Sequence, residues 1–174
     1  MSTTPTHRRL RIAGALAALA TVALLAAAPA HAAGTTSAVC TNLFTITITP
    51  GFSMTPTSGT VTTDSGSITC VGKIDGHRVT GPGTMSIKET YTDVTCISSL
   101  ISGTMYINVP TTAGDKDMEG ALTVQRTALV VRPEARFPDA RFSGVGVVVP
   151  TQGNCFATPL RKAVLSVTGT LTGA

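Results

Sequence analysis

Apolar and polar residues alternate along most of the chain after residue 33, and this period of two predicts β-strands. Residues 43–49, for example, place Phe44, Ile46 and Ile48 on one face and threonines on the other. The same alternation recurs in residues 60–63, 67–72, 84–91, 100–109, 118–131, 140–149 and 161–171. No stretch after residue 33 has apolar positions at helical spacing, so the sequence predicts an all-β domain.

Turn-forming residues separate these runs. Asp75 and Gly76 lie between two short alternating stretches, and a type I′ hairpin turn favours this pair because both central residues need positive φ. We also expect a break at residues 81–83 and connections at residues 52–59, 110–115, 132–139 and 151–159. The pattern predicts about eight antiparallel strands in a closed or nearly closed barrel, with a Greek-key sandwich as the alternative.

One predicted strand carries polar residues on its apolar face. In residues 84–91, Glu89 and Tyr91 share a face with apolar neighbours, and Asp93 continues the alternation. If this face lines a barrel interior, Glu89 and Tyr91 could bind a polar ligand or act as an acid and base. The alternative is a strand end whose carboxylates are exposed. Residues 118–131 read as one long strand, straight or bent midway, and alternation would place Arg126 on the same face as Leu122 and Val124.

The first 32 residues have the features of a secretory signal peptide. Basic residues at positions 7–11 precede an apolar run over residues 12–28, and Ala30-His31-Ala32 offers a cleavage site. We therefore expect a signal peptide at residues 1–32 and a secreted β-domain at residues 33–174. The apolar run is short and lacks basic stop-transfer residues, so no membrane span is expected after cleavage.

Removal of the signal peptide nearly neutralises the chain. Three of the 13 lysines and arginines lie in the signal, which leaves ten cations against nine acidic residues. A net charge this small does not provide the basic surface that nucleic-acid binding requires. We expect no nucleic-acid partner.

All four cysteines lie in the exported part, where an even number predicts two disulfides. The favoured pairing is Cys40–Cys70 and Cys96–Cys155. Three predicted strands separate Cys96 from Cys155, however, which places these two at opposite ends of a simple meander, so the other connectivities stay open. The cysteines lack C-x-x-C spacing, and we expect neither a metal nor another cofactor.

Arginines gather in the C-terminal third, at positions 126, 132, 136 and 141. The tripeptide Ala-Arg-Phe occurs twice, at residues 135–137 and 140–142. Arg126, Arg132, Arg136 and Arg141, together with Phe137, could form an exposed surface that binds an anion or a protein partner. The alternative is local ion pairing with neighbouring acids.

Two further candidates favour structural interpretations. His77 follows a tight turn, where side chains are exposed, so we expect a surface histidine. Residues 114–120 resemble the opening of a calcium loop, but Arg126 stands where the bidentate glutamate would be needed. We expect a solvated hairpin there.

The composition, rich in Ala, Gly, Thr and Val with two expected disulfides, is similar to that of secreted β-proteins of high-GC bacteria such as the enediyne-binding apoproteins. That family closes short disulfide loops, whereas the cysteines here are widely spaced, so no ligand-contacting residue is carried over. The favoured function is a non-catalytic binding domain for a small ligand or a protein partner. A small isomerase- or cyclase-like barrel enzyme using Glu89, Tyr91 and Arg126, and a structural cell-surface protein, are the alternatives.

Overall fold

A computed structural model describes residues 35–63 and 66–173, which lie in one compact unit. The predicted signal peptide falls outside the described residues, as do residues 64–65. Every regular element of the described part is a strand, so the predicted all-β class is confirmed. Within this same part, no helix is found that could cross a membrane.

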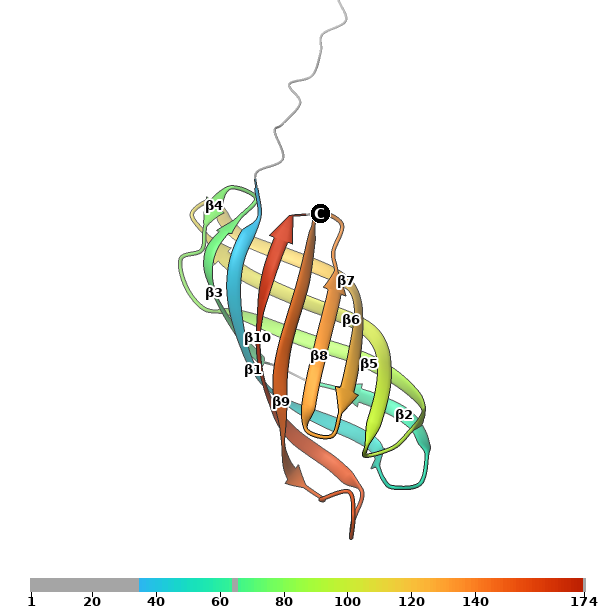
Figure 1. Ribbon diagram of the computed structural model, residues 1–174. Coiled ribbons are helices and arrows are strands. Elements are labelled where there is room, and N and C mark those ends of the chain that lie inside the picture. The colour runs from blue at the N-terminus through green and yellow to red at the C-terminus, as the bar shows by residue number, and fades with distance from the viewer. Residues whose placement is uncertain (1–34, 64–65, 174) are drawn as a thin grey trace, which may run out of the picture. The chain divides into compact units, whose positions relative to one another are not determined.

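The strands are long and antiparallel (Figure 1). They are β1 (Ser37–Phe52), β2 (Thr57–Thr62), β3 (Gly66–Ile74), β4 (His77–Arg78), β5 (Gly83–Val94), β6 (Ser98–Thr111), β7 (Gly114–Thr127), β8 (Val130–Arg136), β9 (Ala140–Gln152) and β10 (Leu160–Gly173).

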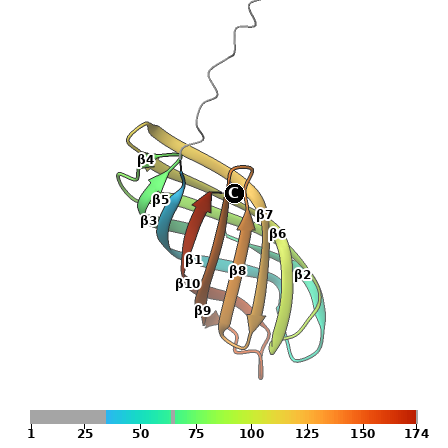
Figure 2. The same cartoon turned by 45° about the horizontal axis from the view of Figure 1, so that its top comes forward.

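The sheet closes into a barrel because β1 pairs with β10 from Ser37↔Thr172 to Thr47↔Lys162. A ring of eight strands results, running β1–β2–β5–β6–β7–β8–β9–β10 and back to β1. The strands wrap round a common axis in Figures 1 and 2. β2 and β3 share one position in this ring, since both run antiparallel to β1 and also pair with β5. The predicted closed barrel is confirmed. Closure leaves only the two-residue β4 at an end of the sheet in the described part of the chain, so little open edge remains to template aggregation.

The barrel interior is the apolar core, and strand alternation fills it. Phe44, Ile46 and Ile48 of β1 are buried, as their spacing predicts. On β10 the inward side chains are Ala163, Leu165, Val167 and Leu171. Threonines and serines are common at the alternate positions on the outer wall, above all on β1, β5 and β10. Each buried aliphatic side chain contributes about 1.5–3 kcal/mol of hydrophobic stabilisation.

The prediction of one long strand over residues 118–131 is wrong. β7 ends at Thr127, residues 128–129 form a turn, and β8 begins at Val130. Ala128 adopts φ 52°, a conformation for which alanine has no preference, so the sequence carried no turn signal there. The connection expected at residues 132–139 is wrong for the same reason, because β8 occupies it as far as Arg136.

The additional turn removes the objection to the favoured disulfide pairing. Four strands, β6 to β9, lie between Cys96 and Cys155, and an even number returns the chain to the same end of the barrel. Both predicted disulfides, Cys40–Cys70 and Cys96–Cys155, are present. Cys40 and Cys70 face each other directly in the β1–β3 register.

The predictions for the Asp75-Gly76 turn and for the face of Asp93 have different outcomes. Asp75 and Gly76 form the predicted hairpin turn between β3 and β4, with φ values of 51° and 81°. Alternation placed Asp93 on the same face as Glu89 and Tyr91, and the structure does not. The φ of 51° at Asp93 interrupts the alternation, so its side chain is exposed while Val94 turns inward. The strand-end alternative, with exposed carboxylates and a buried ring, holds for Asp93 and Tyr91 but not for the buried Glu89.

Candidate functional site

Four connections meet at one end of the barrel, the lower end in Figure 1. They comprise residues 53–56, 95–97, 128–129 and 153–159. Successive strands run in opposite directions, so every second connection reaches this end. Backbone hydrogen bonds tie the connections together, from Cys96 N to Ser53 O (2.8 Å) and from Ala128 N to Ile97 O (2.7 Å). The Cys96–Cys155 disulfide anchors the longest of them.

These connections surround a pocket of about 300 Å³ with a mainly apolar lining, which we call the mouth pocket. Its lining residues are Met54, Cys96, Ile97, Arg126, Ala128, Leu129, Val148, Pro150, Asn154, Cys155, Phe156 and Leu160. Four large apolar side chains among them, Met54, Ile97, Leu129 and Phe156, are exposed, and Phe156 is 84% exposed. Exposed apolar side chains gathered round a pocket are typical of a binding site.

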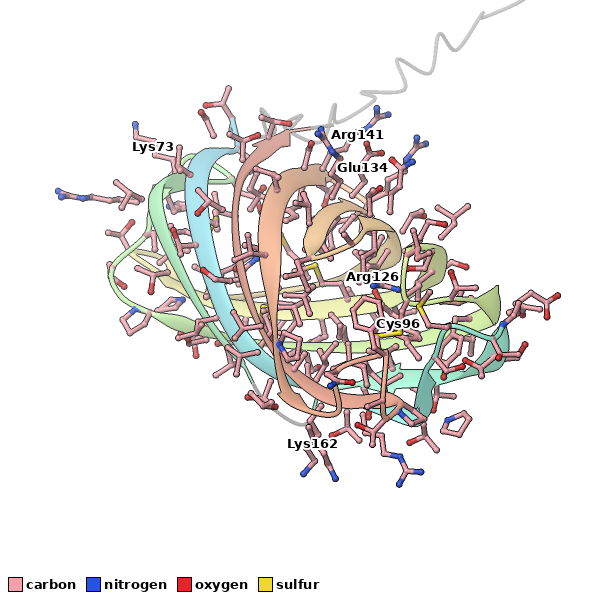
Figure 3. The ribbon with its side chains drawn as sticks, turned by 60° about the horizontal axis from the view of Figure 1, so that its bottom comes forward. Lys73, Cys96, Arg126, Glu134, Arg141 and Lys162 are labelled. Carbon is pink, nitrogen blue, oxygen red and sulfur yellow. A yellow bond between two sulfur atoms is a disulfide. The ribbon has the colours of Figure 1, made fainter. Side chains whose placement is uncertain are left out.

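Arg126 of β7 lies at the inner end of the mouth pocket and is only 4% exposed. Its Nε donates to Ser99 Oγ (3.1 Å), and its Nη1 donates to the carbonyl oxygens of Cys96 (2.8 Å) and Ala128 (3.0 Å). Nη2 donates to the carbonyl oxygen of Thr95. Arg126 and Cys96 lie close together in Figure 3. The arginine therefore holds two of the connections in place.

Aromatic rings pack beneath this arginine. The guanidinium carbon of Arg126 lies 4.8 Å from the centre of the buried Phe52 ring, a cation–π geometry. Phe52 in turn packs edge-on against Tyr91, with ring centres 4.9 Å apart. The Tyr91 hydroxyl donates to the carbonyl oxygen of Thr49 (3.2 Å). These contacts connect β1, β5 and β7 at this end of the barrel.

The barrel interior contains a separate, smaller cavity of about 50 Å³. Arg126, Val148 and Leu160 line both spaces, so Arg126 stands between them. Glu89 lines the interior cavity and is 3% exposed. Burial raises the pKa of Glu89 to about 7. Its Oε1 has no hydrogen-bond partner among residues 35–63 and 66–173.

Asn42 of β1 is a second buried polar residue on the interior cavity, and the sequence interpretation missed it. Its Oδ1 also lacks a hydrogen-bond partner in the described part of the chain. Strand alternation could have identified it, because Asn42 stands two residues before the inward Phe44 and therefore shares its face of the strand. Asn42 and Glu89 thus each place a buried oxygen without a hydrogen-bond partner in the described residues on side chains that line this mainly apolar cavity.

The residues predicted as site candidates fall into two groups. Glu89, Tyr91 and Arg126 lie inside the barrel. The remaining arginines, Arg132, Arg136 and Arg141, are exposed on the outer face of β8 and β9, whereas Arg126 is buried. Arg132 lies beside Arg126 in the β7–β8 register but on the opposite face of the barrel wall.

The outer arginines do not form a cluster with phenylalanine. Arg136 and Arg141 are opposite each other across the β8–β9 pair. Figure 3 shows Arg141 and Glu134 pointing outward, far from Arg126. Phe137, which the sequence suggested as an exposed anchor, is buried at 6% exposure. The two Ala-Arg-Phe repeats thus follow strand alternation, with arginine outward and phenylalanine inward.

The other candidates are surface features. His77 is exposed on β4, as expected. Residues 114–120 form the start of β7 after a tight turn, and Lys116 there pairs with Asp75. Across the described residues, no group of three or more His, Cys, Asp or Glu could hold a metal ion.

Met54, Ile97, Leu129 and Phe156 of the mouth pocket were not identified from the sequence. Each lies outside the strands, where strand alternation makes no prediction. The one usable signal was Phe156, an aromatic residue directly after a disulfide-bonded cysteine in a loop of Gly, Asn, Thr and Pro.

Comparison with known protein families, characterised proteins and solved structures finds no match to this chain.

Proposed function

We propose that residues 33–174 are a secreted, non-catalytic binding domain whose ligand is a small, mainly apolar molecule held in the mouth pocket. The observation that carries this proposal is the pocket itself, about 300 Å³ with apolar walls and a single charged side chain at its inner end. Small-molecule sites of about this size combine an apolar lining with a few polar groups.

The surroundings of Glu89, Tyr91 and Arg126 favour binding over catalysis. A catalytic acid or base must reach its substrate within hydrogen-bond distance. Glu89 faces a cavity of about 50 Å³, which has room for water but not for a typical substrate. Tyr91 donates to the backbone, and Arg126 holds four neighbouring acceptors. The isomerase- or cyclase-like alternative therefore has less support.

The closed ring gives little support to a structural cell-surface role. That alternative relies on self-association through an open strand edge. β10, one end of the sheet, pairs with β1, and the other end is β4, which is only two residues long. The two disulfides support an extracellular location, because disulfides persist in oxidising compartments. Secretion through the signal at residues 1–32 is part of the proposal.

A neutral apolar fluorophore, N-phenyl-1-naphthylamine, tests the proposal directly. Its fluorescence should rise on binding to the disulfide-bonded protein. The double variant Leu129→Ser/Phe156→Ser should weaken binding by about tenfold or more, because it removes two apolar contacts of the mouth. Both side chains are exposed, so the fold should be unaffected.

The matched control is the double variant Val145→Ser/Val149→Ser, which removes two exposed apolar side chains from the outer face of β9. It should bind the fluorophore as the wild type does. Absence of binding to the wild type, or equal losses in the two double variants, would overturn the proposal.

A further inference from the structure

The positive charge of Arg126 has no opposite charge beside it. All four of its hydrogen-bond acceptors are neutral, namely one serine hydroxyl and three backbone carbonyls. In the described part of the chain, Lys116 forms an ion pair with Asp75, whereas Arg126 forms none. A charge taken out of water without a counter-charge is costly, even when its hydrogen bonds are made.

The interior carboxyl group does not supply that counter-charge. Glu89 lines the interior cavity together with Arg126 but does not line the mouth pocket. No ion pair joins the two side chains in the described residues, and burial alone accounts for the raised pKa of Glu89, without attraction from a cation. The charge of Arg126 is therefore open to compensation from the mouth side.

A count of donors shows that Arg126 can accept one more partner. A guanidinium group carries five N–H donors. Nε uses its one N–H on Ser99, and Nη1 uses both of its N–H groups on Cys96 and Ala128. Nη2 uses one on Thr95, which leaves a single N–H. A ligand oxygen could bind this N–H without displacing any contact that holds the loops.

We infer that the ligand of the mouth pocket is an amphiphile with an acidic head group, whose carboxylate receives a hydrogen bond from Nη2 of Arg126 while its apolar chain lies against Leu129 and Phe156. This inference rests on the proposed function and specifies the class of ligand. The acidic head neutralises the buried cation, and the apolar chain covers side chains that are otherwise exposed to water. Acetate shares the head group but lacks the chain, so it should bind weakly.

The experiment compares decanoate with 1-decanol, which have the same chain length and differ in charge. Each is titrated against the protein below its aggregation concentration, by displacement of N-phenyl-1-naphthylamine. Decanoate should bind at least about tenfold more tightly than decanol, because its carboxylate accepts a charge-assisted hydrogen bond that the neutral hydroxyl of decanol does not match. Decyltrimethylammonium, with the opposite charge, should bind more weakly than decanol.

Arg126→Gln should abolish the preference for decanoate over decanol, and Arg126→Lys should keep part of that preference. Thermal melting first shows whether both variants fold. If they do not fold, the comparison of decanoate with decanol on the wild type tests the inference by itself. Equal binding of decanoate and decanol by the wild type would overturn the inference and leave the proposed function intact. Failure of all three amphiphiles and of the fluorophore would overturn both.

Discussion

Glu89 and Arg126 are buried ionisable side chains in contrasting surroundings. Glu89 leaves Oε1 without a partner and has its pKa raised to about 7 by burial, so its neutral form is favoured at mildly acidic pH. Arg126 has four acceptors and a cation–π contact, which stabilise its charged form although burial lowers its pKa. We therefore expect Glu89 to make the free energy of unfolding depend on pH, and Arg126 to contribute to it through its hydrogen bonds.

Glu89 should make the folded barrel less stable as the pH rises. The unfolded chain loses the Glu89 proton near pH 4.5, whereas the folded barrel holds it to about pH 7. The protonated form of Glu89 therefore contributes its full stabilisation below pH 4.5. As the pH rises from 4.5 to 7 the free energy of unfolding should fall by about 3 kcal/mol, and above pH 7 it should change no further on account of Glu89. Urea unfolding of the wild type and of Glu89→Gln at pH 4.5 and 8 measures it.

The Glu89→Gln variant should lose much less stability than the wild type between these two pH values. Glu119→Gln provides the control, since Glu119 is exposed on β7 and its replacement should leave the pH dependence of the wild type unchanged. A wild type equally stable at pH 4.5 and 8 would contradict the buried, neutral state of Glu89.

Arg126 should be important for stability as well as for ligand binding. Arg126→Gln leaves carbonyl oxygens of residues 95, 96 and 128 without their donor, and we expect a loss of about 2–3 kcal/mol in the free energy of unfolding. Arg132→Gln, on the exposed face of β8, should change stability by less than about 0.5 kcal/mol. Chemical denaturation compares the two; similar small effects would contradict the role of Arg126 in holding the loops.

The turn between β7 and β8 is the element in which local sequence and observed structure disagree. Ala128 adopts φ 52° although alanine does not favour positive φ. Its N–H donates to the carbonyl oxygen of Ile97 in the neighbouring loop, and its carbonyl oxygen accepts from Arg126, and both hydrogen bonds keep the turn in place. The turn at Asp75 and Gly76 has similar φ values and the residues that favour them. Tertiary contacts thus overcame a weak local preference at Ala128.

Ala128→Gly should stabilise the protein by about 0.5–1 kcal/mol, because glycine adopts positive φ without the steric cost that alanine has. The same change at Ala121, an exposed position within β7, should destabilise it by a similar amount. Melting temperatures of the two variants therefore should move in opposite directions. A fall in both would show that the turn is not strained.

The two disulfides of the barrel join different kinds of element. Cys40–Cys70 joins neighbouring strands β1 and β3, whereas Cys96–Cys155 joins two connections at the mouth. The sequence separations are 30 and 59, so loop-closure entropy predicts about 4 kcal/mol of stabilisation from each. Their effects on binding should differ even where their effects on stability are alike.

Cys96→Ala/Cys155→Ala should weaken binding of N-phenyl-1-naphthylamine several-fold, because the connection that carries Phe156 loses its covalent anchor. Cys40→Ala/Cys70→Ala should reduce the melting temperature comparably and leave binding unchanged at temperatures where the protein remains folded. Equal binding by both double variants would contradict a role of the Cys96–Cys155 disulfide in shaping the mouth.

Strand alternation alone determined which side chains share a face, so that Glu89 falls with Tyr91 and Arg126 with Val124. Only the structure decided that the face of Glu89 lines the interior. Alternation is a local property of extended backbone, so it can be read from successive residues wherever the strand is regular. It failed at Asp93 and Ala128, where positive φ interrupts that regularity. The disulfide pairing was anticipated from the sequence, but its geometry became consistent only with the additional strand.

The tertiary structure decided the mouth pocket and the partners of Arg126. Met54, Ile97, Leu129 and Phe156 belong to four different connections, which meet only because the ring closes and an even number of strands separates them. The uncompensated charge of Arg126 likewise depends on which loops reach it. Residues distant in sequence are brought together by closure of the sheet, and no local pattern contains that information.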